Sequence, residues 1–145
     1  MGKSAYALNN ALNVAKKYNK TVAIFNLEMS REQLVMRLLA CESFVDGKKM
    51  ATGKLSEEEW GKLCMASASL SQTDIRIDDN PSVTVADINA KCRRLDNLGL
   101  VIIDYLQLMN GSGYGKGGGE NRGTVVGEIS RALKIMAKEL NVPVI

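Results

Sequence analysis

The chain has 145 residues, the length of one ordinary domain, and its formal net charge is 19 − 16 = +3. Hydrophobic residues make up 46% and charged residues 24%, the balance of a globular protein that can bury a core. Histidine is absent from the sequence, which excludes Ser-His-Asp and Cys-His catalysis and every His-ligated metal site. Its apolar stretches are too short to span a bilayer and no secretory leader opens the chain, so we expect a cytoplasmic protein with no membrane partner.

Three cysteines, Cys41, Cys64 and Cys92, are widely spaced along the chain. Their odd number and their spacing fit neither a disulfide framework nor a zinc site. We therefore expect reduced, buried thiols.

The first part of the chain predicts a helix, a strand and a second helix. Good helix formers fill residues 5–19, with apolar residues at helical spacing. Residues 22–27 are a short run rich in β-branched and apolar residues, which indicates a buried strand. Ser30 then begins a helix, because Gln33 lies three residues further on, as a capping box requires.

The middle of the chain repeats this alternation. Ser56 with Glu59 and Thr84 with Asp87 form two more capping boxes, each in front of a helical pattern. Between those helices, residues 75–77 are a candidate strand.

The last part of the chain contains a strand, a loop, a helix and a final strand. Leu100–Ile103 is continuously apolar, as in a parallel strand that is buried on both faces. Six of the thirteen glycines lie within 110–119, and we expect a glycine-rich loop over 110–123. Helical spacing returns over 129–140, and 142–145 begins another strand.

Alternating helices and short apolar strands indicate an α/β fold with a mainly parallel sheet. The first helix has no strand in front of it, and the last strand runs to the final residue. We therefore expect one partial domain over 1–145, truncated at both ends.

Gly2, Lys3 and Ser4 stand directly in front of the first helix, in the order that ends a phosphate-binding loop. Glycine lets phosphate approach the backbone, the helix N-terminus favours negative charge, lysine reaches the β- and γ-phosphates, and the serine hydroxyl can ligate Mg²⁺. The alternative is a disordered start with a solvated lysine.

Two carboxylates follow apolar strands. Asp104 stands at the end of Leu100–Ile103, where a P-loop enzyme places its Mg²⁺-linked acid. Glu28 follows the strand over 22–27, where a carboxylate can deprotonate or orient the attacking water. The alternatives are a turn or cap residue at Asp104 and, favoured on spacing alone, an acid that stabilises the next helix N-terminus at Glu28.

Lys116 and Arg122 belong to the glycine-rich loop, where they could contact a nucleic-acid phosphate backbone. Only one aromatic residue, Tyr114, is interleaved, and the net charge of +3 is a weak electrostatic footprint. Spacing and charge alone leave this contact open.

Long stretches of the sequence closely resemble bacterial DnaB-type replicative helicases, in the RecA-like motor domain. The similar stretches are Phe25–Ser30, Gln33–Ala40, Ala90–Leu95, Val101–Met109 and Ala137–Ile145.

The resemblance implies a RecA-like P-loop NTPase core whose Walker A motif ends in Gly2, Lys3 and Ser4. It makes Asp104 the Walker B acid, Ser4 and Asp104 the Mg²⁺ ligands, and Glu28 the catalytic glutamate. The implied activity is ATP-driven 5′-to-3′ translocation on single-stranded DNA and duplex unwinding by a homo-hexamer.

Primase and a helicase loader are implied partners of that hexamer. The family's arginine finger and second DNA loop would lie beyond Ile145, so we expect residues 1–145 alone to be inactive. The resemblance also implies that the strand in front of Walker A pairs beside the Walker B strand, so its absence should leave an unpaired edge along Leu100–Ile103. The alternatives are another RecA-fold ATPase, of recombinase or clock type, and a non-catalytic P-loop fragment.

Overall fold

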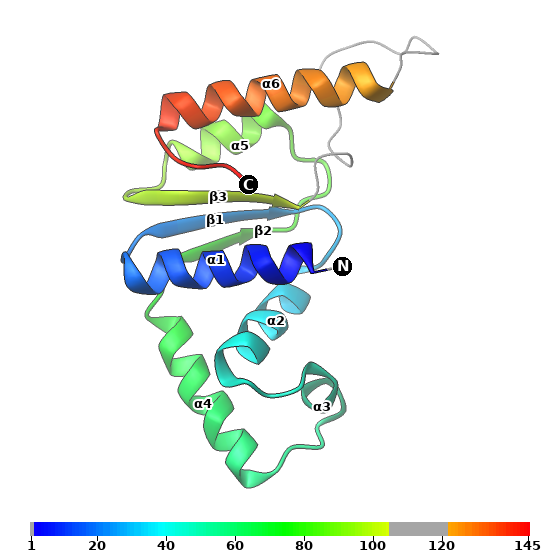
Figure 1. Ribbon diagram of the computed structural model, residues 1–145, viewed down its shortest axis with the longest axis vertical. Coiled ribbons are helices and arrows are strands. Elements are labelled where there is room, and N and C mark those ends of the chain that lie inside the picture. The colour runs from blue at the N-terminus through cyan, green and yellow to red at the C-terminus, as the bar shows by residue number, and fades with distance from the viewer. Residues whose placement is uncertain (1, 105–121) are drawn as a thin grey trace.

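The computed structural model describes residues 2–104 and 122–145, and the side chains of all of these except 122–124. The chain folds into three layers, with a parallel sheet between two layers of helices (Figure 1). The elements in chain order are α1 (Lys3–Lys17), β1 (Thr21–Asn26), α2 (Arg31–Ser43), α3 (Gly47–Thr52), α4 (Glu57–Ser71), β2 (Ile75–Asp78), α5 (Val85–Cys92), β3 (Leu98–Asp104) and α6 (Arg122–Leu140).

The described strands run in the order β2-β1-β3, and both pairings are parallel. All six residues of β1 are buried, because this strand has a neighbour on each side and helices on both faces. The register places Asn26, the last residue of β1, opposite Asp104, the last residue of β3. Both strands therefore end at one edge of the sheet, which is where ligands bind in open α/β folds.

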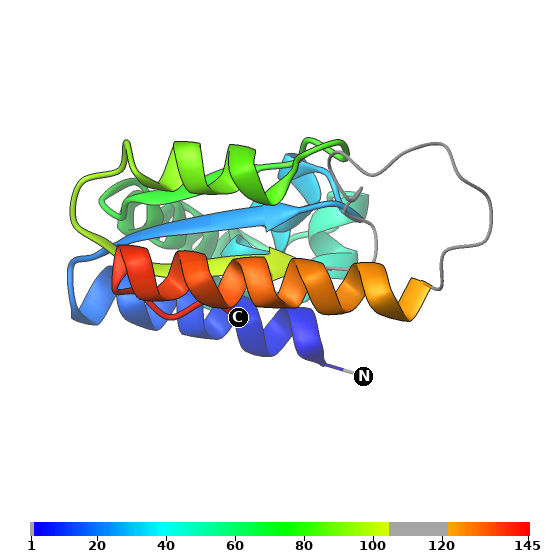
Figure 2. The ribbon, with the colours of Figure 1, turned by 90° about the horizontal axis from the view of Figure 1, so that it is seen from above.

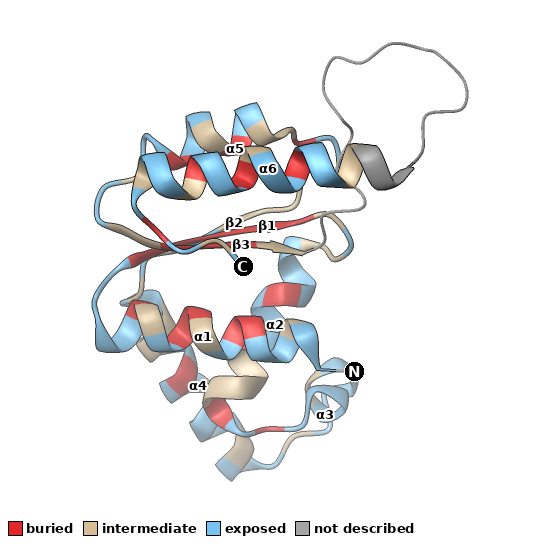
Figure 3. Ribbon diagram, turned by 45° about the horizontal axis from the view of Figure 1, so that its top comes forward, coloured by how far each residue is buried: buried red, intermediate tan, exposed pale blue. Residues whose placement is uncertain are grey.

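Alternate residues of the strands enter two separate cores. Val22 and Ile24 of β1 pack with the apolar stripe of α1 and with α2. Ala23 and Phe25 point to the other face and pack under α5 and α6. Figure 2 shows α5 and α6 side by side across that face, and Figure 3 shows the buried stripes of the helices turned toward the sheet. Because successive side chains of a strand point to opposite faces, the strand residues contribute to the cores on both sides of the sheet.

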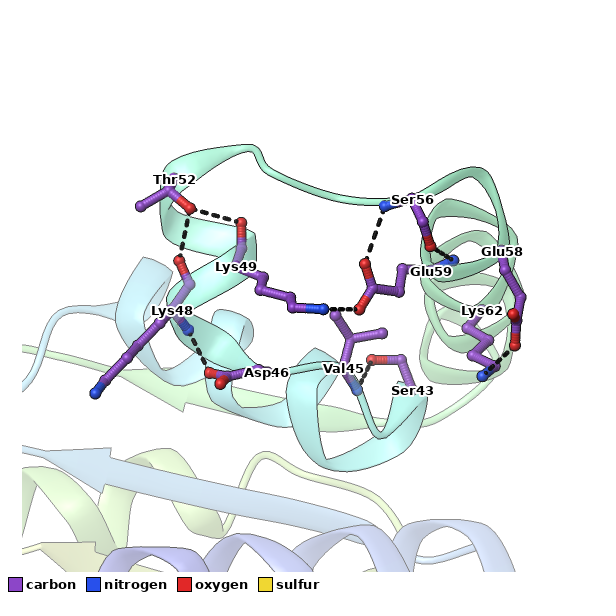
Figure 4. A network of polar contacts seen from close by, with 10 residues as sticks. All are labelled: Ser43, Val45, Asp46, Lys48, Lys49, Thr52, Ser56, Glu58, Glu59 and Lys62. Carbon is purple, nitrogen blue, oxygen red and sulfur yellow. Dashed lines mark hydrogen bonds and ion pairs between the residues drawn. The ribbon is translucent and has the colours of Figure 1, made fainter.

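Helices α2, α3 and α4 lie on the same side of the sheet as α1 and extend away from it (Figure 1), and α2 also packs into the core beneath β1 through Leu34 and Leu38. In Figure 4, the Glu59 carboxylate accepts hydrogen bonds from the Ser56 backbone N–H at 2.9 Å and from Lys49 Nζ at 2.7 Å. The Asp46 side chain caps α3 by accepting from the Lys48 N–H at 2.8 Å. Glu59 therefore closes the capping box of α4 and also ties that helix to α3.

The predicted helices and the first three predicted strands are confirmed, including the three capping boxes at Ser30, Ser56 and Thr84. The strand predicted over 142–145 is present only as a single bridge residue, Val144. Helix α3 was not predicted. Helix α6 begins at Arg122, so the last two residues of the predicted 110–123 loop are helical instead. Residues 110–121 of that loop lie outside the described part of the chain.

The prediction of an unpaired edge along Leu100–Ile103 is wrong. The Val101 N–H donates to the Pro143 carbonyl at 3.0 Å, and the Ile103 N–H donates to the Ile145 carbonyl at 2.8 Å. Val144 forms a parallel bridge with Val101. The last residues of the chain thus pair with the side of β3 that was expected to be free.

The cysteines are free thiols, as predicted, but they are not all buried. Cys92 is buried in the core under α5, Cys41 is half-buried and Cys64 is exposed on α4. Among the described residues, no helix is long and apolar enough to cross a membrane.

Candidate functional site

The N-terminus of α1 lies at the edge of the sheet where β1 and β3 end. Gly2 is the N-cap of α1, with φ 118° and ψ 0°. This conformation is strained for a residue with a side chain, but glycine adopts it freely. The first intrahelical bond runs from the Tyr6 N–H to the Gly2 carbonyl at 2.9 Å. The N–H groups of residues 3–5 precede that bond, and the first turn carries no acidic residue, so this helix end is suited to an anion.

Ser4 and Asp104 are in direct contact although 100 residues separate them. The Ser4 hydroxyl donates a hydrogen bond of 2.7 Å to Asp104 Oδ2, and both residues are partly buried. The helix start and the strand end that the sequence singled out are therefore one site. A hydroxyl and a carboxylate are hard oxygen donors of the kind that Mg²⁺ prefers.

Glu28 follows β1 in a short turn that is fixed to this site through the backbone. The Leu27 N–H donates to the Asp104 carbonyl at 2.8 Å, which extends the pairing of β1 and β3 by one residue. The Asn26 side-chain oxygen then accepts from the N–H groups of Glu28 at 2.9 Å and Met29 at 2.6 Å. The Glu28 side chain itself is exposed.

The residues present fit a magnesium-bound polyphosphate. Mg²⁺ is commonly held by one or two protein oxygens together with substrate phosphates and water, so the pair Ser4 and Asp104 is a sufficient protein contribution. A cage of three or more acidic or sulfur ligands, the usual sign of an all-protein metal site, does not occur among the described residues. Lys3 lies on the first turn of α1 with its side chain exposed, free to reach a phosphate at that helix end.

The structure brings together Gly2, Lys3 and Ser4 on α1, Asp104 on β3 and the turn that carries Glu28. It shows no contact between the Glu28 carboxylate and the Ser4–Asp104 pair among the residues that it describes. Lys116 and the side chain of Arg122 lie outside the described residues. The residue that sequence reasoning missed is Asn26, whose signal is a polar side chain at the end of an otherwise apolar strand.

Comparison with known proteins identifies the family. The model of the DnaB-like helicase C-terminal domain matches residues 1–145. The chain is 57% identical to the replicative DNA helicase DnaB of Geobacillus stearothermophilus and 55% identical to the replicative DNA helicase DnaC of Bacillus subtilis. Each alignment covers 100% of this chain and 32% of the relative, so the chain spans about a third of those helicases.

Solved structures agree with this assignment at the level of the fold. One structure, described as that of a DnaB-like replicative helicase and its interactions with primase, superposes with a TM-score of 0.87 and 33% identity, over 99% of this chain and 35% of that one. A second structure, of an ATPase domain, superposes with a TM-score of 0.86 and 33% identity, over 99% of this chain and 51% of that one. The RecA-like α/β architecture is thus shared over nearly the whole chain, and the chain belongs to the DnaB-like helicase C-terminal domain family.

Proposed function

We propose that the chain is the central part of an ATP-driven replicative DNA helicase motor, in which ATP hydrolysis drives 5′-to-3′ movement on single-stranded DNA and unwinds the duplex. The hydrogen bond between Ser4 and Asp104 is the observation that carries the proposal. This bond joins the N-terminus of α1, which can bind phosphate, to the end of β3, where Asp104 can bind a metal ion. The family assignment supports the same activity.

Each residue of the site has a distinct role in this proposal. The backbone at Gly2 lets the β-phosphate approach the free N–H groups of α1, and Lys3 neutralises charge on the β- and γ-phosphates. Ser4 and Asp104 hold Mg²⁺, which when bound lowers the cost of charge that builds up on the phosphate oxygens. Glu28 orients the attacking water and accepts its proton.

The role of Lys3 is tested by ATP turnover in the complete natural protein. Lys3→Ala removes the cation that faces the phosphates, so we expect turnover to be abolished with and without single-stranded DNA. Lys17→Ala is the matched control, because Lys17 is exposed at the opposite end of the same helix. Near-normal turnover by Lys3→Ala would remove the phosphate-binding loop from the proposal.

The role of Glu28 is tested by separating ATP binding from hydrolysis. Glu28→Gln keeps the shape of the side chain but cannot accept a proton, so we expect ATP to bind while turnover falls by about 10²-fold or more. Loss of ATP binding in this variant would make Glu28 a structural residue, as the alternative of a helix-stabilising acid requires.

Single-stranded DNA is the proposed track, and Lys116 and Arg122 are proposed contacts to its phosphates. Replacing both with alanine is expected to weaken DNA binding and to flatten its salt dependence, because each lost phosphate contact lowers the slope by about 0.7. An unchanged slope would show that these residues do not contact the DNA backbone.

The assembly proposed for the complete protein is a cytoplasmic homo-hexamer with ATP between subunits. Primase and a helicase loader are its proposed partners, and primase is named in the description of one structural neighbour. Strand displacement on a forked duplex distinguishes this helicase from a recombinase-type or clock-type ATPase. A complete protein that binds no nucleotide would instead support a non-catalytic P-loop module.

A further inference from the structure

We propose that Asn26 is a positioning residue for ATP hydrolysis: its side-chain oxygen fixes the turn that carries Glu28 at the edge of the sheet where Ser4 and Asp104 meet. This inference rests on the proposed function, in which Glu28 serves the attacking water. It assigns a role to a residue that neither binds phosphate nor titrates.

Asn26 is a buried polar residue at the end of the central strand β1. The side chain is 1% exposed, at the end of a strand whose other residues are apolar apart from Thr21. Its Oδ1 accepts two hydrogen bonds, from the N–H of Glu28 at 2.9 Å and from the N–H of Met29 at 2.6 Å. One buried acceptor thus satisfies two consecutive donors, and its removal leaves both without that partner.

The position of Asn26 in the sheet explains why this turn matters for the site. Asn26 is opposite Asp104 in the β1–β3 register, and the Leu27 N–H still donates to the Asp104 carbonyl at 2.8 Å. The backbone is therefore fixed to β3 through residue 27 and turns immediately afterwards. Asn26 also shares a strand face with Val22 and Ile24, the face covered by α1, whose first turn carries Ser4.

Placement of this kind affects hydrolysis more than nucleotide binding. A general base must come within about 2.6–3.2 Å of the group it deprotonates. A misplacement of about 1 Å can lower a rate by about 10²-fold. Phosphate binding depends on the first turn of α1, which makes no hydrogen bond to Asn26 among the described residues.

The test measures kcat for ATP hydrolysis and the Kd for ATP in the complete natural protein. Asn26→Ala removes the acceptor, so we expect kcat to fall by about 10- to 100-fold while the Kd for ATP changes by less than about twofold. Asn26→Ser restores a shorter acceptor that can bond to a nearby N–H, so its kcat should lie between those of Asn26→Ala and the parent.

Two control variants separate positioning from folding. Asn80→Ala removes the same kind of bond, in which the Asn80 side-chain oxygen accepts from the Ser82 N–H at 3.0 Å, in the turn after β2. Ile24→Val perturbs the buried core of the same strand without touching the turn. We expect the parent kcat in both. If Asn26→Ala does not fold, Asn26→Ser carries the test, with a reduced kcat and an unchanged Kd.

A double variant decides whether Asn26 acts through Glu28. In single-turnover measurements, Asn26→Ala added to Glu28→Gln should lower the rate no further, because the group that it positions is already disabled. A further loss in the double variant, or a loss of ATP affinity that matches the loss of kcat, would overturn the inference and make Asn26 structural. Normal turnover by Glu28→Gln alone would overturn the proposed role of Glu28 instead, and the inference with it.

Discussion

Gly99 lies near the start of β3, where this strand passes against the turn that follows α1. A Cβ atom at this position would meet Lys20 Cβ at 2.5 Å and Val14 Cγ1 at 3.3 Å. The first of these atoms is attached directly to the backbone, so it cannot move aside as the end of a long side chain can. The close approach of two backbones, rather than an unusual φ, requires glycine here.

Gly99→Ala is therefore expected to lower the free energy of unfolding by about 1–3 kcal/mol, the usual cost of overpacking. Gly61→Ala is the matched control, because a Cβ on this glycine of α4 meets nothing within 4 Å. The control should be neutral or stabilising by up to about 1 kcal/mol, since alanine favours a helix. Urea unfolding of both variants checks this, and equal stabilities would contradict the close contact at Gly99.

Single residues of the site were predictable to different degrees. Ser4 and Asp104 could be identified because a short motif and a strand end each suggest a chemical role, and the structure places the two side chains 2.7 Å apart. Asn26 could be noticed as a polar residue at a strand end, but its two hydrogen bonds to the backbone of residues 28 and 29 could not be predicted. Such bonds depend on the backbone conformation of the turn after the strand. The spacing of residues in the sequence does not determine that conformation.

Among the elements, α4 shows how one side chain can serve two helices. Glu59 completes the capping box with Ser56 and also pairs with Lys49 of α3. The hydrogen bond from Lys49, followed by that from the Ser56 backbone, lowers the pKa of Glu59 below its usual 4.5. Because the folded-state pKa lies below the unfolded one, the charged carboxylate stabilises the fold above about pH 4.5 and loses this effect as the pH falls through the folded pKa.

Glu59→Gln should therefore lower the melting temperature at pH 7, and the difference from the parent should shrink as the pH falls below 4.5. Glu57→Gln is the control, because Glu57 is an exposed residue of the same first turn without the contact to α3. Melting curves between pH 3 and pH 7 test this expectation. A difference that stays constant over that range would show that the ion pair is not the cause.

Ser56→Ala should also destabilise α4, by about 1 kcal/mol, because the N-cap hydroxyl that accepts from the Glu59 N–H is lost. The measurement is the free energy of urea unfolding at neutral pH. Ser67→Ala, in the interior of the same helix, makes the same side-chain change away from the cap. If both substitutions cost the same, the capping box does not stabilise this helix.

The elements that the sequence predicted share a strong local signal. The three capping boxes each mark the start of a helix, and alternation in β1 sends successive residues into opposite cores. Helix α3 has six residues and no buried member, so it carries no hydrophobic period. Its ends are set by the Asp46 cap and by Gly53 at φ 70°, signals too short to identify a helix by themselves.

At the scale of the whole molecule, the order of the strands could not be read from the sequence. Apolar runs identify strands but do not state which strands are neighbours. The pairing of residues 143–145 with the outer side of β3 depends on such long-range contacts. The same sheet carries both cores, so loss of either face should unfold the molecule as one unit.

Cys92 reports this cooperative unfolding. It is 1% exposed, and burial raises the pKa of its thiol to about 11, so both access and thiolate content are low in the folded state. A thiol reagent should therefore modify the exposed Cys64 in native buffer and Cys92 only as the protein unfolds in urea. Mass spectrometry of labelled peptides identifies the modified residue. Modification of Cys92 at the native-state rate of Cys64 would contradict a closed core on the α5 and α6 face.

The central claim is that the Ser4–Asp104 pair is the magnesium-nucleotide site of the molecule. The most direct test measures ATP affinity with and without Mg²⁺ for the complete natural protein and for the variants Ser4→Ala and Asp104→Asn. We predict that Mg²⁺ strengthens ATP binding by the parent and that each variant loses most of this gain while keeping its metal-free affinity. The same gain from Mg²⁺ in both variants and in the parent would contradict the claim.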